Sequence, residues 1–441
     1  MIEKYLVKKI TEPVDWKVTV PGSKSMTNRA LLLAALSAGT VRVEGVLFSD
    51  DSRHFLACLV SLGFAVQIEE EKKCVTVTGC GGRIPRGEAV IDVGSAGTAA
   101  RFLAAMLGFS DGCYEIRCSA QMKRRPMAEL FDLLSGAGAK ITFLEEEGHL
   151  PVRITGCRYA RADKTAGETP RELSLDITKS TQFLSALLLI APMVPEGMKI
   201  HITSEKTDGS YIRITRKMMQ EFGVSVAFDG RDYEVPCRSS YRKETYMVEP
   251  DMSAACYFYA AAAVTGGRAL VRHVHMDNTQ GDLRFLEVLE RMGCKADDTP
   301  EGVRVTGPAD GALRGITVNM NDFSDQALTL AAIAPFADAP VRIEGIGHIR
   351  GQECDRIHAI QTNLTALGIR CEEEETAATI YPGSPHGGSV ETYDDHRVAM
   401  AFSLVGLRTD GIVIENPACC RKTFENYFTV LSELTGKKTE A

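Results

Sequence analysis

The sequence has few aromatic residues and no long apolar run. Among its 441 residues there is one tryptophan, and aromatic residues make up 7%. The most apolar run, which contains Leu187 and Ile190, ends at Pro192 and is too short to span a membrane. The first ten residues, MIEKYLVKKI, alternate charged with apolar side chains and lack the layout of a secretory signal. We therefore expect a cytoplasmic protein without a membrane partner.

The cysteines also lack a recognisable pattern. There are thirteen, an odd number, with no CxxC pair, and the sequence contains no HExxH motif. The adjacent Cys419 and Cys420 are poorly placed to form one metal site. We expect most of the cysteines to be buried thiols in a reducing compartment, and we expect no metal site.

The charge balance is acidic. Fifty basic residues stand against 58 acidic ones, giving a net charge of −8. This balance argues against a nucleic-acid-binding surface. The basic residues are nevertheless grouped in a few short motifs, so a local anion-binding site is compatible with the overall charge.

Two kinds of segment recur along the chain. The first is an amphipathic helix that ends at a glycine and continues into a short strand. Its six copies end at Gly63, Gly138, Gly223, Gly293, Gly368 and Gly436. The spacing is too long for a solenoid repeat and suits a compact α/β subunit.

The second kind of segment is apolar on nearly every side and begins with a polar cluster. A helix of this composition belongs inside a domain. The six copies are SKSMTNRALLLAALSAG, GSAGTAARFLAAMLG, KSTQFLSALLLIAPM, DMSAACYFYAAAAVTGG, SDQALTLAAIAPFA and DDHRVAMAFSLVGL. Six units, each with one inner and one outer helix, divide naturally into two α/β domains of three units. The alternative is that helix–glycine–strand segments occur in any α/β protein.

Helix beginnings are the expected functional positions. The first backbone N–H groups of a buried helix have no partner within that helix, and the helix dipole is positive there. If the inner helices direct their beginnings at one cleft, that cleft attracts anions before any side chain is considered. The polar clusters lie at these beginnings.

The strongest single motif is Pro21–Leu31, PGSKSMTNRAL. Gly22 permits a tight turn, and a serine can cap the following helix. Ser25 and Arg29 are four residues apart and share a helix face, directly after Lys24. An ammonium, a hydroxyl and a guanidinium together suit a phosphate or carboxylate. The alternative is a capped helix with solvated charges.

Three further motifs in the first half are individually ambiguous. Val93–Arg101 is a small-residue loop that opens an apolar helix; it is either an anion site or a routine turn. Three cations, Lys123 to Arg125, precede Pro126, which is suited to the first turn of the next helix; surface solvation is the alternative. The string Ser180–Gln182 supplies neutral hydrogen-bonding groups or a simple cap.

The second half has four such motifs. Asp325 begins an apolar helix, where a cap is the alternative to a chemical role. Glu353 and Arg356 are spaced i, i+3. Residues 394–397, DDHR, open the sixth inner helix, and residues 421–424, RKTF, lie near the end. Their common position at helix beginnings favours function over surface charge.

These strings, in this order, resemble the EPSP synthases (3-phosphoshikimate 1-carboxyvinyltransferases) of the enolpyruvyl transferase family. The resemblance covers residues 15 to 430 approximately, and the PGSKS and DHR motifs are the most specific. It implies two similar α/β domains, each of three βαβαββ units in an inverse α/β barrel. The domains would comprise residues 21–246, and residues 1–20 plus 247–441, with the active site in the cleft between them.

The resemblance also implies roles for particular residues. Asp325 would accept a proton from the attacking 5-hydroxyl, Glu353 would handle protons at the enol carbon, and Lys24 would lie near both substrates. The residues implied to bind shikimate 3-phosphate are Lys24, Ser25, Arg29, Ser180, Thr181, Gln182, Tyr211, Asp325, His348 and Gln352. Those implied to bind phosphoenolpyruvate are Lys24, Gly97, Arg125, Gln182, Arg356, Arg397 and Lys422.

Three positions depart from the commoner family pattern. Asp208 replaces a serine and would repel a substrate phosphate, so either Thr207 or Ser210 takes over that contact or the contact is lost. Gln352 replaces a lysine and removes one cation. His348 replaces an asparagine and can still donate a hydrogen bond. These departures bear on substrate affinity and leave the reaction class unchanged.

The resemblance predicts an enzyme that moves the enolpyruvyl group of phosphoenolpyruvate to shikimate 3-phosphate without a metal or organic cofactor. We expect a monomer whose partners are small molecules. One alternative is a UDP-N-acetylglucosamine enolpyruvyl transferase, but Cys118 lies outside that family's usual spacing before Arg125. Another is a non-catalytic anion-binding homologue, which the presence of Lys24, Asp325 and Glu353 disfavours.

Overall fold

The computed structural model describes residues 3–157, 169–178, 180–309 and 312–436. Its contacts divide the chain into two compact units, each with its own apolar core. Unit 1 comprises Met1–Pro21 and Pro250–Ala441, and unit 2 comprises Gly22–Glu249. The chain therefore begins in unit 1, builds the whole of unit 2, and returns.

Unit 2 contains three four-stranded sheets. In spatial order, the first sheet consists of β14 (Thr245–Met247), β3 (Thr40–Glu44), β5 (Cys74–Thr78) and β4 (Ala65–Glu69). The second consists of β6 (Glu88–Asp92), β7 (Cys113–Arg117), β9 (Val152–Thr155) and β8 (Lys140–Phe143). The third consists of β10 (Arg171–Leu175), β11 (Met198–Ile202), β13 (Asp232–Val235) and β12 (Ala227–Phe228).

Unit 1 repeats this plan. Its first sheet consists of β2 (Asp15–Val18), β15 (Arg268–Arg272), β17 (Gly302–Thr306) and β16 (Lys295–Thr299). The second consists of β18 (Thr317–Asn319), β19 (Val341–Glu344), β21 (Ala377–Ile380) and β20 (Cys371–Glu373). The third consists of β22 (Gly388–Val390), β23 (Ile412–Glu415) and β1 (Lys4–Leu6).

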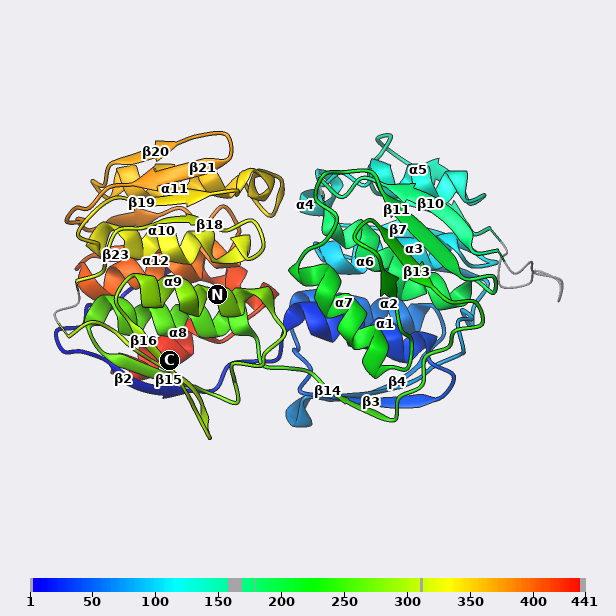
Figure 1. The fold of residues 1–441 in the computed structure, drawn as a ribbon, viewed down its shortest axis with the longest axis horizontal. Coiled ribbons are helices and arrows are strands. Elements are labelled where there is room, and N and C mark those ends of the chain that lie inside the picture. The colour runs from blue at the N-terminus through cyan, green and yellow to red at the C-terminus, as the bar shows by residue number, and fades with distance from the viewer. Residues whose placement is uncertain (1–2, 158–168, 179, 310–311, 437–441) are drawn as a thin grey trace. The chain divides into compact units, whose positions relative to one another are not determined.

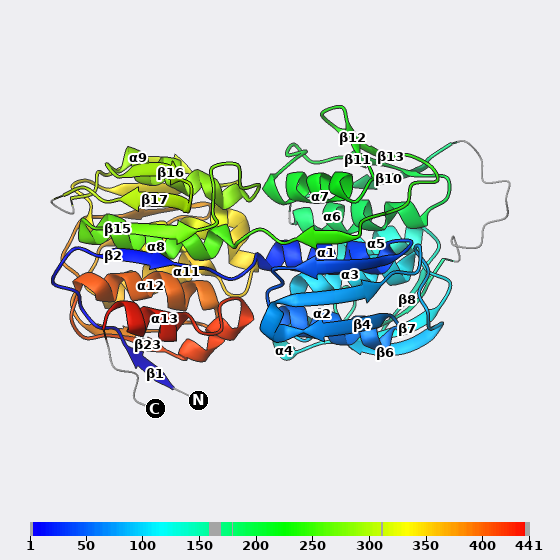
Figure 2. The same ribbon diagram turned by 90° about the horizontal axis from the view of Figure 1, so that it is seen from below.

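Every sheet combines one parallel pair of strands with antiparallel neighbours. The parallel pairs are β14 with β3, β6 with β7, β10 with β11, β2 with β15, β18 with β19, and β22 with β23. A helix connects the strands of most of these pairs, as a parallel connection requires. Three sheets are completed by strands from distant parts of the chain, and Figure 2 shows one of these strands, β2, beside β15.

The second kind of sequence segment forms the inner helices. Four of the six are buried along almost their whole length, and in α1 and α6 the burial begins at the third residue. They are α1 (Lys24–Leu36), α3 (Gly97–Gly108), α6 (Thr181–Ile190), α8 (Met252–Thr265), α10 (Ala327–Ile333) and α12 (His396–Arg408). Within unit 1, α8, α10 and α12 pack against one another (Figure 1). The prediction of six inner helices is confirmed.

The amphipathic segments form the outer helices. They are α2 (Asp50–Ser61), α5 (Ala128–Gly136), α7 (Ser210–Glu221), α9 (Phe285–Arg291), α11 (Arg356–Ala366) and α13 (Tyr427–Leu434). The six glycines that the sequence placed after them all have positive φ, from 64° at Gly436 to 105° at Gly293. A left-handed residue after a helix is sterically inexpensive only for glycine, which explains the repeat.

Two local predictions need correction. Pro126 lies before α5, whose N-cap is Met127, so it is outside the first helical turn. Gly22 has no positive φ, but a Cβ there would lie 1.9 Å from the carbonyl oxygen of Gly45. Close backbone approach, and not a turn, therefore requires glycine at this position.

The cysteines are also less uniformly buried than expected. Six of the thirteen are fully buried, and two, Cys80 and Cys237, are exposed. In the described parts of the chain, no helix is long and apolar enough to cross a membrane.

Candidate active site

Arg356 is the centre of a buried charge network in unit 1. It is the first residue of α11, and its side chain is 1% exposed. It donates from Nη1 to Asp325 (3.0 Å), from Nη2 to Glu353 (2.9 Å) and from Nε to Asp395 (2.8 Å). Gln352 accepts a further hydrogen bond from Nη1. A buried guanidinium requires such partners, and here it fixes the two carboxyls that the sequence nominated for proton transfer.

Asp325 lies between two guanidinium groups. Its Oδ1 accepts from Arg356, and its Oδ2 accepts from Nη2 of Arg397 at 2.8 Å. Arg397 is held at the beginning of α12, where the N-cap residue Asp395 accepts from the Arg397 backbone N–H at 2.9 Å. Asp325 itself lies in the 3₁₀ turn η5 (Ser324–Gln326), which leads into α10. It is therefore a carboxylate that bridges two guanidinium groups.

The remaining predicted residues of unit 1 join this network. Nζ of Lys422, in η8 (Pro417–Lys422), lies 3.3 Å from Glu353 Oε1, and Lys422 is 7% exposed. His348 Nε2 lies 2.8 Å from Oγ of Ser324, the residue before Asp325. The seven predicted residues thus form one connected group in unit 1: Asp325, His348, Gln352, Glu353, Arg356, Arg397 and Lys422.

Acidic residues to which the sequence analysis assigned no role balance these cations. Asp395 pairs with Arg356, and the buried Asp282 lies beside Ser253, which contacts Arg397. The three cations of the network therefore accompany four carboxyl groups. Burial alone would lower the pKa of Arg356, but the carboxylates of Asp395, Glu353 and Asp325 raise it. In this unit the cations of the network are therefore matched by acids.

Arg29 occupies a different environment in unit 2. It is 2% exposed and donates to Thr215 Oγ1 (2.8 Å), Ser185 Oγ (3.3 Å), and the carbonyl oxygens of Ser25 (2.9 Å) and Tyr211 (3.3 Å). These four acceptors are all uncharged. Burial consequently lowers the pKa of Arg29 to about 10. A buried cation without a carboxylate among these partners is well suited to an anionic ligand.

A second group of cations surrounds the beginning of α3. A Cβ on Gly97 would lie 2.5 Å from Nη1 of Arg125 and 2.8 Å from Nη1 of Arg101. Arg101 Nη1 also donates to Gln182 Oε1 at 2.9 Å, which joins the beginnings of α3 and α6. Arg101 was within a quoted motif but was assigned no role. Two guanidinium groups close to a helix N-terminus suit an anion.

The other predicted residues of unit 2 lie at helix beginnings. Lys24 Nζ is 3.5 Å from Asp51, and Ser25 Oγ is 3.2 Å from Ser23 Oγ. Ser180 caps α6 by accepting from the backbone N–H of Gln182 at 3.2 Å, while Thr181 is the first residue of that helix. Ser23 is the N-cap residue of α1 but makes no side-chain cap hydrogen bond.

The structure also accounts for the departures and the weaker motifs. Asp208 pairs with Arg213 at 2.9 Å and accepts from Tyr233 at 3.2 Å, which offsets its negative charge. Of the three consecutive cations, Arg124 is exposed and Lys123 pairs with Glu145 at 2.6 Å. Arg125 is the one that approaches Gly97.

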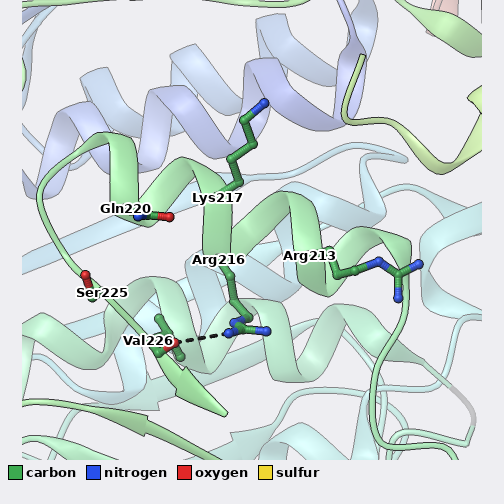
Figure 3. A pocket seen from close by; sticks show the side chains of 6 residues that line it. All are labelled: Arg213, Arg216, Lys217, Gln220, Ser225 and Val226. Carbon is green, nitrogen blue, oxygen red and sulfur yellow. Dashed lines mark hydrogen bonds between the residues drawn. The ribbon is translucent and has the colours of Figure 1, made fainter. Parts of the chain in front are cut away.

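A separate basic hollow lies on the outer face of α7 (Figure 3). It is lined by Arg213, Arg216, Lys217, Gln220, Ser225 and Val226, none of which the sequence nominated. Arg213 pairs with Asp208, Lys217 lies 3.7 Å from Glu249, and Arg216 donates to the carbonyl of Val226 at 3.3 Å. Each of the three cations that line the hollow thus has a partner within unit 2.

Comparisons with known proteins identify the family. A profile of the EPSP synthase family (3-phosphoshikimate 1-carboxyvinyltransferase) matches residues 8–431. The chain belongs to this family. A 3-phosphoshikimate 1-carboxyvinyltransferase of Trichormus variabilis is 41% identical, over 97% of this chain and 98% of that protein. A relative of the same name from Sulfurovum sp. is 40% identical, over 96% of this chain and 97% of that protein.

Solved structures show the same fold. The EPSP synthase of Acinetobacter baumannii matches with a TM-score of 0.79 and 25% identity, covering 98% of this chain and 97% of that one. The enolpyruvyl transferase NikO from Streptomyces tendae matches with a TM-score of 0.73 and 16% identity, covering 98% and 97%. The predicted family and the two-domain enolpyruvyl transferase fold are both confirmed.

Proposed function

We propose that this protein transfers the enolpyruvyl group of phosphoenolpyruvate to the 5-hydroxyl of shikimate 3-phosphate and releases inorganic phosphate, a step of the shikimate pathway towards chorismate and the aromatic amino acids. The observation that carries the proposal is the bridging position of Asp325 in a chain that belongs to the EPSP synthase family. A carboxylate held between two guanidinium groups is oriented for proton transfer and lies beside groups that bind anions.

The two units contribute different parts of the chemistry. In unit 2, Arg29, Ser25, Tyr211 and the residues 180–182 hold shikimate 3-phosphate, while Lys24 contacts both substrates. In unit 1, His348 and Gln352 complete the shikimate phosphate site. Phosphoenolpyruvate is bound by Lys24, Gly97, Arg125, Gln182, Arg356, Arg397 and Lys422. We propose that both half-sites act on one pair of substrates, in a cleft between the domains.

The reaction follows from these positions. Asp325 takes the proton of the attacking hydroxyl, and Glu353 delivers a proton to the methylene carbon of the enolpyruvate. The hydroxyl oxygen bonds to the central carbon of the enolpyruvate and gives a tetrahedral adduct with a methyl group. Phosphate then leaves as Glu353 takes a proton back from that methyl carbon, which restores the double bond, and the cations stabilise the charge on the departing phosphate. Each of these steps is a proton transfer, an addition or an elimination, and the reaction as proposed uses no metal or organic cofactor.

The same proposal describes a cytoplasmic monomer that binds neither nucleic acid nor membrane. The net charge of −8 supports the absence of a nucleic-acid partner. The sugar-nucleotide alternative is disfavoured because the compared relatives with about 40% identity are 3-phosphoshikimate 1-carboxyvinyltransferases.

Phosphate release with different acceptors tests the proposal. The purified protein is mixed with phosphoenolpyruvate and either shikimate 3-phosphate, unphosphorylated shikimate or UDP-N-acetylglucosamine. We expect rapid release with shikimate 3-phosphate, because Arg29 and the α6 beginning suit its anionic groups. Release with the sugar nucleotide alone would refute the assignment. Binding of both substrates without any release would support the non-catalytic alternative.

A further inference from the structure

Asp282 is a buried acid behind the candidate active site. It lies in the 3₁₀ turn η4 (Gly281–Arg284) and is 6% exposed. It accepts a hydrogen bond from Oγ of Ser253, the second residue of α8. The same Ser253 Oγ lies 3.4 Å from Nη2 of Arg397. Ser253 therefore connects Asp282 to the guanidinium that also holds Asp325.

The segment that carries Asp282 is fixed against the beginning of α8. Gln280 donates from Nε2 to the carbonyl of Pro250 at 2.7 Å and accepts from the backbone N–H of Met252 at 3.2 Å. Cys256 directs its thiol at the carbonyl of Asp282, 3.7 Å away. These contacts satisfy the hydrogen bonding of buried polar groups and keep the Asp282 carboxyl within hydrogen-bonding distance of Ser253.

Several charged groups face Asp282 from the neighbouring elements. Asp251 lies at the start of α8, Asp325 comes from η5, and Arg397 comes from α12. On α9, Glu287 faces Arg284 at 3.9 Å. Burial, reinforced by the negative charge of Asp325, raises the pKa of Asp282 to about 7, although Arg397 and the Ser253 hydrogen bond act in the opposite direction. Asp282 therefore keeps its proton to a higher pH than an exposed carboxyl does.

We propose that Asp282 is a positioning residue for the transfer reaction. Through Ser253, Asp282 interacts with the same Arg397 guanidinium that pairs with Asp325, and it thereby sets how readily Asp325 accepts the substrate proton. This inference rests on the proposed function. When Asp282 is ionised, it competes with Asp325 for the same guanidinium, and its like charge makes Asp325 a stronger base. When Asp282 is protonated, Arg397 stabilises the Asp325 anion alone, and Asp325 is a weaker base. The proton that leaves the substrate hydroxyl goes to Asp325 in both cases.

The pH profile of turnover tests this arrangement. We measure kcat and the KM of each substrate between about pH 5.5 and 9 for the wild type and for Asp282→Asn. The wild-type kcat should rise with pH through neutrality as Asp282 ionises. The asparagine keeps a side-chain oxygen for Ser253 but carries no charge. Its kcat should be about tenfold lower above pH 7 and should lack the rise through neutrality, with the KM for phosphoenolpyruvate changed less than about threefold.

Matched variants separate this effect from a loss of structure. Asp277→Asn changes an exposed acid five residues earlier and should keep the wild-type profile. Ser253→Ala removes the hydrogen bond that lowers the pKa of Asp282 and should shift the rise to higher pH, whereas Ser253→Thr keeps the hydroxyl and should retain the wild-type profile. Asp282→Asn with a wild-type profile, or with a uniform loss at every pH, overturns the inference.

The activity of the wild-type protein shows whether a negative result overturns the inference about Asp282 alone or the proposed function as well. A wild type that releases no phosphate overturns the proposed function, and the inference with it. An active wild type with an unchanged Asp282→Asn profile overturns the inference alone.

Discussion

The Asp325 carboxylate lies 2.8 Å from the guanidinium of Arg397, so the proposed base is ion-paired with a residue proposed to bind the donor substrate. The phosphate and carboxylate of phosphoenolpyruvate would compete with Asp325 for the same N–H groups. Donor binding should therefore loosen this ion pair and leave Asp325 a stronger base. The arrangement couples substrate binding to proton transfer.

Replacing Asp325 by asparagine should separate turnover from binding. We expect kcat to fall by about a hundredfold to ten-thousandfold, because the amide cannot take the hydroxyl proton. Phosphoenolpyruvate should bind at least as tightly as before, because the change removes a negative charge beside Arg356 and Arg397. Phosphate-release kinetics and titration calorimetry measure the two effects. Asp410→Asn, an exposed change in the same unit, is the control, and unchanged turnover of Asp325→Asn would show that another group is the base.

Replacing Arg356 by methionine should destabilise unit 1. The change leaves Asp325, Glu353 and Asp395 without their shared cation, and breaking such buried pairs costs about 3–5 kcal/mol. Urea unfolding followed by the fluorescence of Trp16, the single tryptophan, reports on this unit. Arg304→Ala, at an exposed position of β17, should change the midpoint little. Equal midpoints for both variants would mean that the network contributes little to stability.

Adding a methyl group at Gly97 should weaken phosphoenolpyruvate binding specifically. The new Cβ would lie 2.5 Å from Nη1 of Arg125, so this guanidinium must move away from the beginning of α3. A displacement that costs about 1–3 kcal/mol corresponds to a rise of roughly fivefold to 150-fold in the KM for phosphoenolpyruvate. The KM for shikimate 3-phosphate should change much less. Gly87→Ala is the control, because a Cβ on Gly87 meets no atom within 4 Å. A similar KM for phosphoenolpyruvate in both variants would argue against a phosphoenolpyruvate site at the beginning of α3.

The raised pKa of Asp282 predicts how stability depends on pH. Its folded pKa of about 7 lies above its ordinary value of 3.8, so the folded state holds the proton more tightly. Stability therefore declines as pH rises between about 4 and 7, and the loss is complete above this range. Asp282→Asn lacks this decline. The unfolding free energy of the wild type relative to the variant should be lower at pH 8 than at pH 5, as measured by urea unfolding; a constant difference would contradict the buried ionisation.

The sequence predicted the repeating parts of the fold because they depend on local chemistry. Glycine was required after each outer helix, and the six positions have positive φ. The i, i+3 spacing of Glu353 and Arg356 drew attention to this pair, and the two side chains do form an ion pair, although Glu353 lies before α11 and not on its face. The six inner helices were evident because they are apolar on nearly every side.

The counter-charges were not predictable because they come from distant segments. Ser253 and Asp282 are 29 residues apart, and Arg101 and Gln182 are 81 apart. Neither pair shares a motif or a helical period. The role of Gly22 was misassigned for the same reason, because its constraint comes from the backbone of Gly45. A motif shows which cations are present, but only the fold shows which acids accompany them.

Phosphorus and proton NMR on a single reaction mixture test the central claim most directly. The protein is added to equimolar phosphoenolpyruvate and shikimate 3-phosphate, and both phosphorus signals are followed. We predict that the phosphoenolpyruvate signal converts to inorganic phosphate while the 3-phosphate ester remains intact, and that new vinyl protons appear on the shikimate product. Loss of the 3-phosphate ester, or consumption of phosphoenolpyruvate at the same rate without the acceptor, would contradict the account.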